Sequence, residues 1–203
     1  MSSLKKEALA ACQVALARLG FVKYKGALIL ERDSQASGWI GLNLATRGLP
    51  RLLQVNPVVG VRFAHLEKIM LRLRDDVPKT PTAVFSKPLG YLMPENSFRF
   101  WDFSVDGDSE RVAKSLSDAV HAYGVPYIVA HSDWVEFSRN VDIEGFLLEH
   151  EKAKIAPVVH VINGDLEGAR GIVDIELERV SGSSDMYAQS YRRFADRFQV
   201  AFG

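Results

Sequence analysis

The chain has 203 residues, of which 47% are hydrophobic and 25% charged, with 25 Lys and Arg against 25 Asp and Glu. This composition is that of a globular protein and excludes an intrinsically disordered or collagen-like chain. The charge balance argues against a protein whose whole surface binds nucleic acid or an anionic membrane, and leaves room only for a local patch. Five arginines are candidates for such a patch: Arg72, Arg74, Arg192, Arg193 and Arg197.

The first predicted element is an alanine-rich amphipathic helix over residues 2–19, which Gly20 ends. Its Cys12 is the one cysteine of the chain, so no internal disulfide forms, as is usual in a reducing compartment. Polar residues interrupt the apolar half of this segment, so we do not expect a signal peptide. No stretch approaches the roughly 20 apolar residues that span a bilayer. The expected location is the cytoplasm.

Three strands are predicted next, over residues 21–32, 39–46 and 52–59, with a polar turn at 33–38. The connections are too short for parallel crossovers, so the economical topology is an antiparallel meander. Pro57 lacks a backbone N–H, so we expect the end of the third strand to lie at a sheet edge or a bulge.

The middle of the chain mixes helices and strands. The pattern predicts a helix over 63–73, a loop over 75–81, and strands over 82–86 and 98–105. A helix follows over 106–123, which we expect Gly124 to end and Pro126 to keep from continuing. Ser132 is expected to cap a short helix through Phe137.

The last third is predicted to be helical, with a hairpin of helices over 143–162 and 166–180 and a closing helix over 185–202. Residues 155–162 stay open between helix and strand, because they are rich in β-branched residues and contain Pro157. The fold class is therefore α+β, an antiparallel sheet flanked by helices. We expect an α+β domain over 1–140 and a helical extension over 141–203 packed on it.

The usual signatures of enzymes are missing from the sequence. There is no glycine-rich phosphate loop and no serine flanked by glycines at the required spacing. His150-Glu151 begins like a zinc-binding helix, but the second histidine would fall at Lys154. No two of the five histidines lie three to five residues apart. We therefore predict no cofactor, no metal and no catalytic residue.

The most suggestive local feature is a run of acids over residues 102–110, with Asp102, Asp106 and Asp108. Carboxylates at a strand-to-helix junction can hold a divalent cation, but acids at a helix start also cap its free N–H groups. A third interpretation is an acidic surface for a basic protein, with Trp101 and Trp134 as anchors. His131 joins these candidates because Asp133 follows it closely.

Several structural motifs are shared with one family: Leu19-Gly20-Phe21, Trp39 to Asn43, Leu53 to Val61, Pro88 to Leu92 and Trp101-Asp102-Phe103. Through them, residues 13–137 resemble a family of bacterial domains of unknown function that occur near polymorphic toxin systems, several of them suspected immunity proteins. The resemblance implies a protein partner, a toxin, and a mode of action by surface complementarity. It carries over no catalytic residue.

Three functions follow from the sequence. The preferred one is a non-catalytic protein-binding module, an immunity protein that neutralises a cognate bacterial toxin. The first alternative is a small metal-dependent hydrolase that uses the acids of 102–110 or His131. The second is a helical-pair scaffold built on residues 143–203. We expect a protein partner and neither nucleic acid nor a membrane; the sequence leaves the oligomeric state open.

Overall fold

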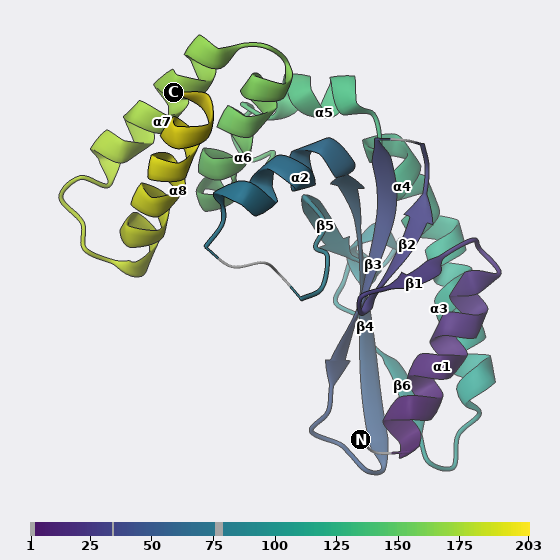
Figure 1. Ribbon diagram of the computed structural model, residues 1–203. Helices are drawn as coiled ribbons and strands as arrows, with labels where there is room; N and C mark the ends of the chain where they lie inside the picture. Colours follow the sequence, from purple (N-terminus) through teal and green to yellow (C-terminus); the bar gives the residue numbers. More distant parts are fainter. Residues whose placement is uncertain (1–2, 34, 76–78) are drawn as a thin grey trace. The chain divides into compact units, whose positions relative to one another are not determined.

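The computed structural model describes residues 3–33, 35–75 and 79–203 (Figure 1). The chain divides into two compact units: a sheet unit of residues 1–62 and 79–133, and a helical unit of residues 63–78 and 134–203. Ser2 of the predicted first helix, Ser34 of the predicted turn and residues 76–78 of the predicted loop lie outside the described residues.

The sheet is antiparallel, which together with the helices confirms the predicted α+β class. Its six described strands are β1 (Val22–Tyr24), β2 (Ala27–Glu31), β3 (Ala36–Ala45), β4 (Leu52–Phe63), β5 (Phe85–Pro88) and β6 (Trp101–Ser104). The order β1-β2-β3-β4-β5 is a meander, and β6 also pairs with β4. The short turn between β1 and β2 places Lys25 and Gly26 at positive φ.

Strand β4 continues past the predicted end at residue 59 to Phe63, and it is an inner strand of the sheet, not an edge strand. Leu52 to Val55 pair with β6, and Val58 to Val61 pair with β5. Pro57 falls between these two stretches, where its missing N–H removes no ladder hydrogen bond on this side. In the same gap the Asn56 side chain donates to the Arg99 carbonyl at 2.6 Å, which ties the strand to the segment before β6.

The described part of the sheet unit contains three α-helices, α1 (Ser3–Ala17), α3 (Ser109–Ala119) and α4 (Val125–His131), and a short 3-10 turn η1 (Leu89–Leu92). They lie along one face of the sheet, and α1 and α3 run side by side (Figure 1). The Ser117 hydroxyl of α3 donates to the Ala15 carbonyl of α1 at 3.1 Å. Cys12 is fully buried in α1, and burial raises the pKa of its thiol to about 12, so it is a small core residue.

The helix that starts at Ser109 continues past Gly124 and Pro126, so the predicted break there is wrong. A π-helical segment η2 (Val120–Gly124) joins α3 directly to α4. Gly124 has ordinary helical backbone angles, and Pro126 lies in the first turn of α4, where a missing N–H is tolerated. A wider π turn is a common way for a helix to accommodate such an irregularity.

The helical unit contains α2 (Ala64–Leu73), α5 (Trp134–Asn140), α6 (Glu149–Ile162), α7 (Leu166–Arg179) and α8 (Met186–Phe202). Residues 155–162, left open by the sequence, are helical. Helices α6 and α7 form the predicted hairpin, and the aromatic stripe of α8 lies in the core, with Tyr191, Phe194 and Phe198 buried. Within the described part of the chain, no helix combines the length and apolar composition needed to cross a bilayer.

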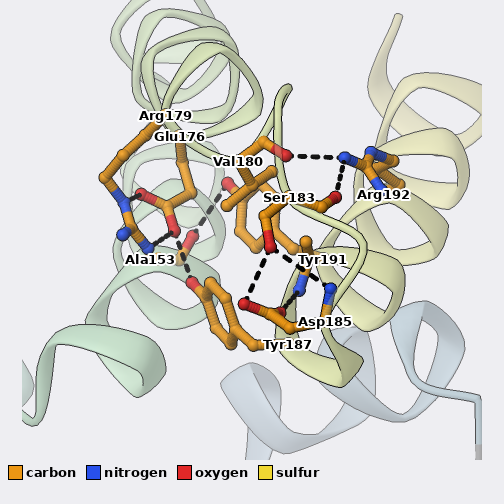
Figure 2. Close-up of polar contacts among 10 residues, drawn as sticks. Ala153, Glu176, Arg179, Val180, Ser183, Asp185, Tyr187, Tyr191 and Arg192 are labelled. Carbon is orange, nitrogen blue, oxygen red and sulfur yellow. Dashed lines mark hydrogen bonds and ion pairs between the residues drawn. The ribbon is translucent and has the colours of Figure 1, made fainter.

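Pro157 lies inside α6 and is accommodated by a side chain from α8. A proline at this position cannot donate to the carbonyl of Ala153, one turn earlier. The Tyr191 hydroxyl donates to that carbonyl instead, at 3.2 Å (Figure 2). The partly buried carbonyl therefore keeps a partner, and α6 stays helical through the proline.

Candidate functional site

Four of the residues predicted as a site lie around the junction of β6 and α3. Trp101 is buried, with 5% of its surface exposed, and its Nε1 has no hydrogen-bond partner among the described residues. Asp102 is exposed and accepts a hydrogen bond from Gln54 at 3.0 Å. Asp106 lies exposed in the turn. Asp108 is the N-cap of α3 and accepts from the Arg111 N–H at 2.9 Å, so its carboxylate caps a helix.

The other two predicted residues lie apart in different surroundings. His131 ends α4, where a ring nitrogen lies 2.7 Å from the Tyr127 carbonyl and the ring packs against Phe85. Trp134 belongs to the helical unit and donates from its indole to Asn163 at 3.3 Å. In the ranges that the structure describes, no three His, Cys, Asp or Glu side chains are arranged to hold a metal ion.

A groove of about 510 Å³ lies on the helical unit, along the α6–α7 hairpin. Each helix contributes four residues at spacings of three and four, which places them on one helical face. From α6 they are Glu149, Lys152, Ala153 and Ala156; from α7 they are Ile172, Ile175, Glu176 and Arg179. Asp142, from the loop before α6, completes the lining.

The middle of the groove is apolar and open. Ala153 and Ala156 have short side chains, so α6 leaves space that a larger residue would fill. Opposite them stand the two isoleucines of α7, and Ile175 has 71% of its surface exposed. An isolated exposed isoleucine is ordinary, but one that borders a groove supplies an apolar contact for a partner.

The groove end near the start of α8 is held by a buried carboxylate (Figure 2). Glu176 accepts from two nitrogens of Arg179, of which Nε lies at 2.6 Å, and from the Tyr187 hydroxyl. Burial opposes the charged form of Glu176, but these hydrogen bonds outweigh it and lower the pKa of the carboxyl. Burial and the same carboxylate raise the pKa of Tyr187, so its hydroxyl remains a donor.

The α7–α8 connection is fixed by polar contacts as well. Arg192 donates to the carbonyls of Val180 and Ser183, each at 2.6 Å, and Asp185 caps α8 through the Ala188 N–H at 2.7 Å (Figure 2). Arg193 and Arg197, two further candidates for a basic patch, form ion pairs with Asp75 at 2.7 and 2.9 Å. These three arginines therefore serve the helical unit internally.

Charged groups on the α6 side of the groove are also held in place. The Lys152 ammonium donates to the backbone carbonyl of Asp142 at 2.7 Å. The Asp142 carboxylate lies 2.8 Å from Nε2 of His160, and Asp165 lies 2.7 Å from Nδ1 of the same ring. Glu149, by contrast, is exposed and has no ion-pair partner in the described part of the chain.

Sequence reasoning singled out none of the groove residues. The usable signal was the repeated spacing of Ala153 with Ala156 and of Ile172 with Ile175 in two adjacent predicted helices. Comparisons of the chain with protein-family models, curated proteins and solved structures each returned no match. The resemblance to toxin-associated bacterial domains therefore stays a prediction.

Proposed function

We propose that this protein is a non-catalytic protein-binding module that holds an amphipathic helix of a partner protein in the α6–α7 groove. The observation that carries the proposal is the apolar floor, which exposes Ile175 beside the short side chains of Ala153 and Ala156. The groove volume lies within the range of pockets that bind ligands, roughly 300 to 1,000 Å³. A trough along two helices fits a third helix that presents apolar residues three and four positions apart.

The charges around the floor indicate the chemistry of the partner. Glu176 and Arg179 neutralise each other, and Lys152 is bound to a carbonyl. Glu149 is left as the open charge of the rim within the described residues. A partner helix with a lysine or arginine beside its apolar face complements this rim, since opposite charges at an interface fix register and speed association.

The resemblance to toxin-associated bacterial domains supports a more specific version of the proposal. In it the protein acts in the cytoplasm as an immunity protein, and the partner is a cognate toxin. Such a protein covers a functional surface of the toxin and needs complementarity, with no chemistry of its own. The groove supplies the kind of surface that this role requires.

The test is a selection of displayed helical peptides against the full chain, followed by affinity measurements on two variants. We expect the selected peptides to share apolar residues at spacings of three and four and a basic residue. Ile175→Glu places a charge on the groove floor and is expected to weaken binding at least about tenfold. Val200→Glu is the matched control, because Val200 lies on α8, outside the groove lining, with 91% of its surface exposed.

Two outcomes contradict the groove as the binding surface. One is a selection that enriches no sequence; the other is a selected peptide that binds the Ile175→Glu variant as tightly as the parent chain. For the toxin version, co-expression with a toxin encoded beside the gene should restore growth, and the Ile175→Glu variant should fail to do so. If that variant restored growth, immunity would not depend on the groove.

A further inference from the structure

His160 lies between two carboxylates that belong to different parts of the helical unit. Nδ1 faces Asp165, the N-cap of α7, and Nε2 faces Asp142, in the loop before α6. A neutral imidazole has one N–H, whereas the protonated ring has two. Two short contacts to carboxylates on opposite nitrogens therefore require the imidazolium, because the neutral ring would set a lone pair against one carboxylate.

The two carboxylates are held unequally. Asp165 also accepts from the Gly168 N–H at 2.9 Å and so is fixed by the start of α7. Among the described residues the Asp142 side chain has no comparable second bond, and its backbone carbonyl accepts from Lys152. When the ring loses one proton, the remaining N–H stays with Asp165, and the Asp142 carboxylate is the one repelled.

We propose that protonation of His160 fixes the Asp142 side of the α6–α7 groove, and that loss of the proton releases it and weakens the binding of a partner helix. Asp142 and Lys152 both line the groove, so the release changes the wall that a partner contacts. A wall that is ordered before binding costs less entropy on association than one that must be ordered then. The binding part of this inference rests on the proposed function, and the structural part does not.

The groups around the His160 ring determine the direction in which its pKa is shifted. The loop presents Asp142 and α7 presents Asp165 to the ring. Three residues after His160, Asn163 accepts from the Trp134 indole of α5, against which the His65 ring of α2 packs. Burial lowers the pKa of His160, but the hydrogen bonds to Asp165 and Asp142 outweigh it and raise the pKa above its ordinary 6.5. Burial lowers the pKa of His65, the opposite direction to that of His160.

The direction of the pH dependence follows from the linkage between protonation of His160 and folding. Because the pKa of His160 is higher in the folded chain, its stabilisation is complete below its ordinary 6.5 and is lost as the pH rises through the folded pKa. The contact with Asp142 is thus present in mildly acidic solution and absent in alkaline solution. The opposing effect, a rim more negative at high pH and so more attractive to a basic helix, is weakened by solvent and salt.

The structural part is tested by NMR on the full chain without a partner. Between about pH 6 and about pH 9, we expect the His160 ring and the backbone amides of residues 142–148 to titrate with one midpoint. Asp142→Asn is expected to lower that midpoint and to keep the loop amides unchanged, because an asparagine can accept from the protonated ring and donate to the neutral one. The proposal is overturned if His160 titrates while the amides of residues 142–148 do not shift and the spectra remain native-like.

The binding part is tested with a peptide selected on the groove. We expect its affinity for the parent chain to fall by on the order of tenfold across this pH interval. The Asp142→Asn variant should bind tightly at both ends of it, and His160→Gln weakly at both. A fall with pH that persists in both variants overturns regulation by His160. Failure of every peptide to bind would instead count against the groove, while the NMR result would still decide the structural part.

Discussion

Pro157 and Tyr191 illustrate how single residues keep the groove wall in shape. The proline withholds a hydrogen bond from the Ala153 carbonyl, and the tyrosine hydroxyl supplies one from another helix. Ala153 lines the groove, so this bond fixes a floor residue to the core. Neither residue carries a signal of this pairing in the sequence, because they lie 34 positions apart and meet only after α8 packs on α6.

This pairing predicts a coupling between two substitutions. Tyr191→Phe removes only the hydroxyl and leaves a partly buried carbonyl without this donor, so it should lower the free energy of unfolding by roughly 1 kcal/mol. In a Pro157→Ala background the helix can satisfy that carbonyl itself, and the same change should cost clearly less. Urea unfolding of the two single variants and the double variant measures the difference. Equal costs in both backgrounds would mean that the hydroxyl and the proline act independently.

At the scale of whole elements, three aspartates serve as N-caps: Asp108 of α3, Asp165 of α7 and Asp185 of α8. Capping by the acids before α3 was recognisable from the sequence, because capping is local and depends on residues three positions apart. The continuation of β4 through Pro57 could not be predicted from the sequence, since it depends on two separate strands that pair on either side of the proline. The π segment before α4 likewise reflects packing that no local pattern carries.

Capping at α3 gives a prediction that separates two of the three interpretations of the acidic run, helix capping and metal binding. Asp108→Ala should lower the free energy of unfolding by about 1 kcal/mol, the usual cost of losing such a cap. Asp106→Ala is the control and should change it by less than about 0.5 kcal/mol, because Asp106 lies exposed in the turn. Calcium or magnesium should leave urea unfolding of the parent chain unchanged. An increase in stability with the cation that Asp106→Ala abolishes would favour the metal-dependent alternative.

On the scale of the molecule, the two units interleave along the chain. The helical unit takes residues 63–78 from the middle of the sequence, including α2. Asp75, two residues after the end of α2, pairs with Arg193 and Arg197 of α8. The α+β class followed from alternation and helical spacing, which are local. The groove could not be predicted from such local patterns, because it depends on which faces of α6 and α7 meet. Experiments on the groove should therefore use the full chain, since a fragment over 141–203 would lack α2.

The most direct test of the groove is a map of backbone amide shifts as the full chain is titrated with a peptide selected for binding. We predict shifts concentrated on residues 149–156 of α6 and 172–179 of α7. The amides of residues 102–110, the acidic run first singled out from the sequence, should stay unchanged. Shifts centred on 102–110, with α6 and α7 unaffected, would contradict the account and return the binding site to the junction of β6 and α3.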